Sequence, residues 1–186
     1  MRFAVTLACC LIITAPVTAG KITDASVTKV NGIYDASIDV RIIAPVDTVI
    51  RFITDYDNLA VINPSIEESR VLYTYGPDKH RVQSVIKVCI LIYCKQVQLV
   101  QDVQQQGRTV IEVITLPEYS DFISGVARLH FTEVGQTTEM TFIQRFEPDF
   151  WIPPVIGPWL IKRKLMYEVD QTTAIIETAA RRERKK

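Results

Sequence analysis

The chain has no net charge and few histidines. Its 186 residues include 21 Lys and Arg against 21 Asp and Glu, so the formal charge at pH 7 is zero. A nucleic-acid partner needs a concentrated surplus of basic residues, and this balance argues against one. Two histidines leave few candidates for acid–base catalysis. A hydrophobic share of 48% excludes a disordered chain, and the length suits one globular domain.

The sequence also lacks the common catalytic motifs. It contains no His-Glu-x-x-His, Gly-x-Ser-x-Gly, Gly-x-Gly-x-x-Gly or Cys-x-x-Cys pattern. These absences exclude the easily recognised metalloproteases, serine hydrolases, dinucleotide enzymes and zinc sites. We therefore expect no metal site and no tightly bound cofactor.

Long apolar runs are missing too, apart from a short one at the N-terminus. Phe3 to Ile13 follows Arg2 and is too short to span a bilayer. With the small residues of Val17-Thr18-Ala19 behind it, the run is typical of a secretory signal peptide. We predict that residues 1–19 are removed, that the mature chain begins at Gly20, and that the protein is exported. The destination would be the periplasm in a Gram-negative source and the medium otherwise.

Two cysteines remain after this cleavage, and they flank an apolar segment. Cys89 and Cys94 are expected to form a disulfide in an oxidising compartment. If Leu91 and Ile92 form the tip of a tight turn, the cysteines face each other across a strand pair. Ile90, Leu91 and Ile92 would then form an apolar lip for a membrane or a partner. The alternative is a single buried strand with a bulge, because Leu-Ile is poor two-residue turn chemistry.

Strand patterns occupy most of the chain. From Tyr34 to Ile42 apolar and polar residues alternate, which predicts a strand with one buried face. Residues 20–33 form an N-terminal extension, in which the alternation from Val27 to Val30 indicates a strand and Asn31-Gly32 predicts a hairpin turn. Further strand candidates are 66–75, 80–90, 93–103, 109–115, 122–134 and 137–146.

Helical patterns follow the first strand and close the domain. Pro45, Asp47 and the apolar spacing after them predict a short helix, followed by a second. An apolar stripe from Ile161 to Ala180 predicts one long C-terminal helix. We therefore expect an α+β fold, in which a curved antiparallel sheet of six to seven strands grips this helix. Such a sheet leaves a cavity against the helix.

Short motifs between Tyr34 and Ala180 match a known pattern. They are Ala44-Pro45-Val46-Asp47-Thr48-Val49, Asn63-Pro64-Ser65-Ile66, Ser120-Asp121-Phe122 and Pro148-Asp149-Phe150-Trp151-Ile152-Pro153-Pro154. In these motifs residues 34–180 resemble the START-like (SRPBCC) helix-grip superfamily of polyketide cyclases/dehydrases, coenzyme-Q-binding proteins and plant allergens. They are most similar to an exported bacterial branch without a settled activity. The resemblance implies a cavity for a lipid, a quinone or a polyketide, and no particular chemistry.

Candidate cavity-wall residues follow from strand parity and helix spacing. The strands contribute Tyr34, Ile38, Tyr73, Ile86, Leu129, Phe131, Met140 and Phe142, and the gripping side contributes Phe146, Trp159 and Leu165. Parity does not separate residues that line a cavity from those that fill a core. The apolar segment from Trp151 to Trp159 is either a rim of the cavity or a plug for the end of the sheet.

The sequence favours a binder or carrier of a hydrophobic small molecule, and two alternatives stay open. The first is a cyclase/dehydratase-type enzyme that uses Tyr34, Tyr73 or His130 to polarise a carbonyl. The second is a protein-interaction module with a filled cavity, which would work through the lip and the basic tail, residues 181–186. That tail either contacts anionic lipid or is a solvated helix end. The identity of the ligand and the oligomeric state are left open.

Overall fold

The computed structural model describes residues 20–90 and 93–185. The expected signal peptide, the lip residues Leu91 and Ile92, and Lys186 lie outside the described residues. The elements in chain order are β1 (Lys21–Val30), β2 (Ile33–Ile42), α1 (Val46–Ile53), α2 (Leu59–Ile62), β3 (Ile66–Gly76), β4 (Lys79–Ile90), β5 (Tyr93–Gln106), β6 (Val110–Thr115), the 3₁₀ turn η1 (Pro117–Tyr119), β7 (Phe122–Val134), β8 (Thr137–Pro148) and α3 (Gly157–Glu183).

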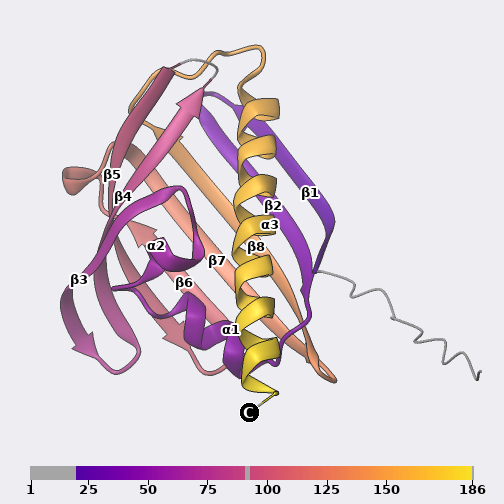
Figure 1. Ribbon diagram of the computed structural model, residues 1–186. Helices are drawn as coiled ribbons and strands as arrows, with labels where there is room; N and C mark the ends of the chain where they lie inside the picture. The colour runs from indigo at the N-terminus through magenta and orange to yellow at the C-terminus, as the bar shows by residue number, and fades with distance from the viewer. Residues whose placement is uncertain (1–19, 91–92, 186) are drawn as a thin grey trace, which may run out of the picture.

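The strands form one curved antiparallel sheet that wraps around α3 (Figure 1). Their order is β1-β2-β8-β7-β6-β5-β4-β3, so the sheet is open, with β1 and β3 at its edges. This is the expected α+β helix-grip architecture, including the short helix pair after β2. The described strands number eight rather than six to seven, because residues of the expected N-terminal extension form β1 and pair with β2.

A tight hairpin joins β1 to β2. Val30 pairs with Ile33, and the two residues between them have φ of 50° (Asn31) and 89° (Gly32). Asparagine and glycine tolerate these positive values, which a two-residue turn requires. The turn therefore fixes the register in which β1 lies on β2.

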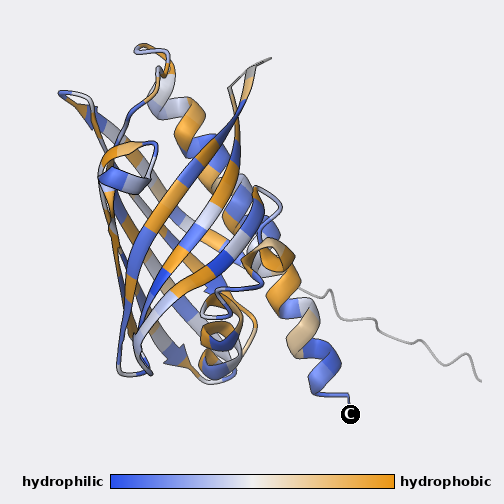
Figure 2. Ribbon diagram, turned by 90° about the vertical axis from the view of Figure 1, so that its left-hand side faces the viewer, coloured by the Kyte–Doolittle hydropathy of each residue, from blue (hydrophilic) through white to orange (hydrophobic). Residues whose placement is uncertain are grey.

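The two-residue alternation of β2 gives the sheet its buried face. Tyr34, Ala36, Ile38, Val40 and Ile42 are each at most 3% exposed, while the residues between them are more exposed. Figure 2 shows the same alternation of apolar and polar residues along neighbouring strands. One face of the sheet is thereby apolar and covered by α3.

Two separate hydrophobic clusters hold α3 against the sheet. The larger one includes Val49 of α1, Phe131 of β7 and Ile176 of α3. The smaller one consists of Tyr34, Phe146 and Ile152, with Ile161 of α3 packed against it. The middle of α3, between the two clusters, is not fully packed on the sheet, and this is where a cavity lies.

Candidate functional site

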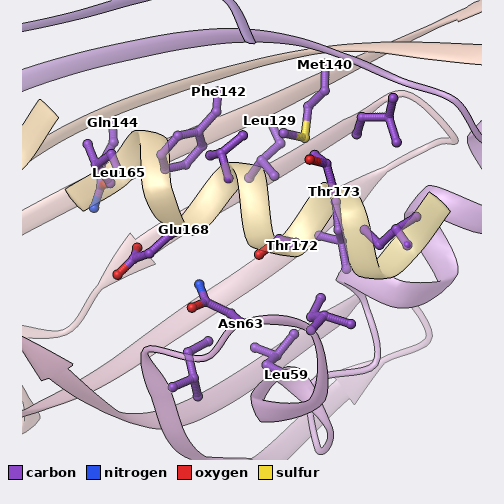
Figure 3. A pocket seen from close by; sticks show the side chains of 16 residues that line it. Leu59, Asn63, Leu129, Met140, Phe142, Gln144, Leu165, Glu168, Thr172 and Thr173 are labelled. Atoms are coloured by element: carbon purple, nitrogen blue, oxygen red, sulfur yellow. The ribbon is translucent and has the colours of Figure 1, made fainter. Parts of the chain in front are cut away.

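Two adjoining hollows lie beside the middle of α3. The larger of these two, called the main hollow below, lies between α3, the sheet and the α1–α2 pair and has a volume of about 250 Å³. Figure 3 shows Leu129, Met140 and Phe142 of the sheet at one side of this hollow, and Leu59 and Asn63 at the opposite side. Other lining residues are Ile42, Ile53, Ile62, Ile66, Gln144, Leu165, Glu168, Val169, Thr172, Thr173 and Ile176. The wall is thus mostly hydrocarbon.

A second hollow of about 160 Å³ adjoins the first toward the N-terminal end of α3. The two hollows share Gln144, Leu165 and Glu168 as lining residues. The remaining wall is apolar apart from Lys164, and consists of Ile86, Val88, Cys89, Leu99, Phe122, Phe146, Phe150, Ile152, Leu160 and Ile161. Together the hollows have the size range and apolar lining of a small-molecule site. The protein's own side chains do not fill this space.

Polar groups gather where the hollows meet. Lys164 and Glu168 lie one helical turn apart on α3, and the Lys164 ammonium is 3.2 Å from the Glu168 carboxylate. The same ammonium donates a hydrogen bond to the Ser65 hydroxyl at 2.5 Å. The side chains of Lys164 and Glu168 are 31% and 17% exposed, so the ion pair is partly buried. With the Gln144 amide nearby, the junction offers both donors and acceptors to a polar group of a ligand.

Six of the residues expected to line a cavity do so. Leu129, Met140 and Phe142 line the main hollow. Ile86 and Phe146 line the second hollow, and Leu165 lines both. The strand residues among them come from strands β4, β7 and β8, whose apolar face is covered by α3.

The other five expected wall residues line neither hollow. Tyr34, Ile38 and Phe131 are buried in the core, at 0%, 1% and 1% exposure, because the residues around them leave no space. Tyr73 and Trp159 are each 58% exposed. Tyr73 follows a register shift in the edge strand β3. The shift breaks the strand alternation that predicted an inward-facing Tyr73.

None of the three candidate catalytic residues reaches the hollows. His130 is exposed, on the opposite face of β7 from Leu129 and Phe131. Tyr73 packs on Tyr75, with ring centroids 4.6 Å apart. The Tyr34 hydroxyl is buried without a hydrogen-bond partner among the described residues, but its ring stacks on Phe146 in the core.

Sequence reasoning missed the polar junction and the wall formed by α1 and α2. Gln144 alternates with the same period as Phe142 and Phe146, so strand alternation alone places it on the inner face of β8. Glu168 lies one turn after Leu165 on the same side of α3. An apolar or aromatic pattern along a strand or helix does not select a glutamine or a glutamate.

A disulfide closes the end of the β4–β5 hairpin. Cys89 pairs with Cys94 across the two strands, with Cα atoms 4.0 Å apart, and Ile90 pairs with Tyr93. The segment is therefore a strand pair and not one bulged strand. Cys89 and Phe150 both line the second hollow, and the Lys95 ammonium of β5 is 5.1 Å from the centre of the Phe150 ring in the connection from β8 to α3. In that connection Trp151 and Val155 are 76% and 91% exposed.

Two further features bear on the class of site. Among the described residues, no group of three or more His, Cys, Asp or Glu side chains is placed to hold a metal ion. Of the helices in the described ranges, none is both long and apolar enough to cross a membrane.

No family model matches the chain, and no curated protein matches it. Solved structures do match. An aromatase/cyclase from a Streptomyces species has a TM-score of 0.65 and 16% identity, covering 81% of this chain and 95% of that chain. A START superfamily protein from Mycobacterium smegmatis has a TM-score of 0.64 and 15% identity, covering 80% and 97%.

A third match is a STAR-related lipid transfer protein from Xanthomonas axonopodis. Its TM-score is 0.59 at 14% identity, and the match covers 84% of this chain and 98% of that chain. At such identities the likeness concerns the fold alone. The matches extend over most of the chain, including the sheet and the gripping helix, and the chain has the START-like helix-grip fold.

Proposed function

We propose that the protein is an exported binder or carrier of a hydrophobic small molecule, such as a lipid, a quinone or a polyketide-like compound. The observation that carries the proposal is the pair of adjoining apolar hollows between the sheet and α3. An unfilled apolar space of this size costs stability, and an apolar ligand would restore the missing contacts. The fold's occurrence in a lipid transfer protein and in an aromatase/cyclase supports this class of ligand.

The junction between the hollows favours a ligand with one polar group. Gln144 and Glu168 line both hollows, and Lys164 lines the second one beside Glu168, so an amphiphile could place its polar group there. A carbonyl, hydroxyl or carboxylate oxygen would accept from the amide of Gln144 or the ammonium of Lys164. Purely aliphatic molecules would leave these groups without a new partner.

Export is the second part of the proposal. The disulfide between Cys89 and Cys94 is consistent with an oxidising compartment, where such bonds persist. The N-terminal sequence has the pattern of the signal peptide that export would require. A carrier in that compartment would meet its ligand at a membrane, and the exposed Trp151 and Val155 beside the second hollow suit transient contact with lipid.

Native mass spectrometry with lipid extraction tests the binding proposal. The protein, exported from the full-length chain, should carry a reproducible lipid or quinone adduct. Leu165→Trp should abolish the adduct, because Leu165 lines both hollows and the larger ring fills them. Ile143→Trp is the matched control, since Ile143 is 54% exposed and points away from the hollows. An unliganded mass after incubation with membrane lipids and quinones would overturn the proposal, as would equal adducts in both variants.

A further inference from the structure

Glu177 is a buried carboxylate whose hydrogen bonding is incomplete. It lies on α3 and is 1% exposed. Its Oε1 accepts a hydrogen bond from the Ile43 backbone N–H at 2.7 Å. Its Oε2 is buried and has no partner among the described residues, and no described residue forms an ion pair with it. Buried carboxylates normally have a counter-ion or several donors, so this one lacks a cationic partner.

Gly20 lies directly against this carboxylate. A Cβ atom at Gly20 would be 2.5 Å from Glu177 Oε1 and 2.8 Å from the Arg41 carbonyl oxygen, so only glycine fits. Covalent geometry puts the backbone nitrogen about 2.5 Å from that Cβ position. The Gly20 nitrogen is therefore within about 5 Å of the carboxylate, a range in which opposite charges interact strongly.

Gly20 is also the residue at which the mature chain is expected to begin. A signal peptidase would hydrolyse the Ala19–Gly20 peptide bond, adding one water and leaving a carboxylate on Ala19 and an α-amine on Gly20. Free α-amines have a pKa of about 7.7–8.0, so the new amine takes up a proton at neutral pH. Cleavage thus creates a positive charge beside Glu177.

We propose that Glu177 is the built-in counter-ion of the N-terminal ammonium that signal-peptide removal creates. The ammonium has three donors, which suit the open Oε2 of Glu177 and the Arg41 carbonyl. Other cations nearby do not take this place: the Arg41 guanidinium pairs with Glu139 at 2.7 Å, and Lys21 is exposed. The proposal rests on the proposed function in one respect only: cleavage during export is what makes Gly20 the first residue.

Processing would therefore stabilise the fold. In the unprocessed chain Gly20 presents an uncharged amide, and the buried carboxylate keeps no counter-ion. In the mature chain the ion pair links the start of β1 to α3. Removing one partner of a buried ion pair is strongly destabilising, because it leaves the other charge uncompensated.

A four-protein urea unfolding series tests the pair. It compares Gly20–Lys186 with a free α-amine, the same chain acetylated at Gly20, and both forms carrying Glu177→Gln. With Glu177, acetylation should raise the unfolding equilibrium constant about 100-fold. With Glu177→Gln, which retains the acceptor for Ile43, most of that difference should disappear. An equal effect of acetylation in both backgrounds would overturn the proposal, because it would report only the bulk of the acetyl group.

A second measurement needs no variant. An acylating reagent should modify the Gly20 α-amine at least about 10-fold more slowly in the native mature protein than in urea, with exposed lysines as the internal standard. Equal acylation rates in the native protein and in urea would overturn the proposed ion pair. The mass of the exported protein gives the cleavage site separately, so failure of export and failure of the ion pair are distinguishable.

Discussion

Arg81 of β4 and Asp102 of the neighbouring strand β5 form a bidentate ion pair. The guanidinium donates from Nε at 2.7 Å and from Nη2 at 2.9 Å to the two carboxylate oxygens. These hydrogen bonds lower the pKa of Asp102 below its ordinary value. A lowered carboxyl pKa contributes stability above the unfolded-state value, about 3.9, and that stability is lost as pH falls through the folded value.

We expect Asp102→Asn to lower Tm by a few degrees at pH 7. The loss should shrink as pH falls below about 4, because the carboxyl of the unfolded chain then takes up a proton before the carboxyl of the folded chain does. Thermal unfolding at pH 7 and pH 3 measures the effect. Glu139→Gln, in the exposed pair with Arg41, is the control and should change Tm little at either pH. A loss of the same size at both pH values would contradict this assignment.

At the scale of elements, the β4–β5 hairpin is the segment whose stability depends on a covalent link. The disulfide joins residues five positions apart, so it restricts a short loop in the unfolded chain. We expect Cys89→Ser with Cys94→Ser to lower the free energy of unfolding by ~2 kcal/mol. Hydrogen exchange should increase near the hairpin end and stay unchanged in β2. Reductant should reproduce the effect in the wild type; a wild type insensitive to reductant would contradict the prediction.

Most elements were predictable from the sequence because their patterns are long and local. The alternation in β2, the Asn31-Gly32 turn and the apolar stripe of α3 each involve neighbours in the chain. The Asn31-Gly32 turn also predicted that the strand before it pairs with β2, but the expected strand count of six to seven left this strand outside the main sheet. The sequence also did not predict which inward-facing residues are buried in the core and which line the cavity. Phe131 and Leu129 share a face of β7, yet Phe131 fills the core and Leu129 lines the main hollow.

The polar part of the candidate site was harder to predict than its apolar walls. Gln144, Lys164 and Glu168 come from β8 and α3, and their proximity arises only when the helix lies on the sheet. The residue pattern along one strand or helix does not indicate which residues of another element will lie beside it. Strand parity and helix spacing indicate the side of an element on which a residue lies, but not what it faces.

For the molecule as a whole, the end with the β4–β5 hairpin and the β8–α3 connection is the proposed membrane-contacting end. We expect Trp151→Ser with Val155→Ser to weaken binding to phosphatidylglycerol/phosphatidylethanolamine vesicles about 10-fold, through loss of buried apolar area. Vesicle co-sedimentation measures this. Ile114→Ser with Ile143→Ser is the matched control, because these residues are 56% and 54% exposed on the sheet. Equal losses in both double variants would contradict a contact localised at this end.

The two ends of α3 are held unequally. Near its C-terminus Ile176 lies in the main core, Glu177 binds Ile43, and Glu183 pairs with Arg51 at 2.6 Å. Its N-terminal end rests on the smaller cluster around Phe146. If the helix tilts, these contacts place its pivot near Ile176, in the C-terminal half. The helix from Gly157 to Ile176 is about 29 Å long, so a tilt of about 5° would move the N-terminal end by about 2.5 Å. A ligand would then pass through the second hollow before the first, while the sheet stays in place.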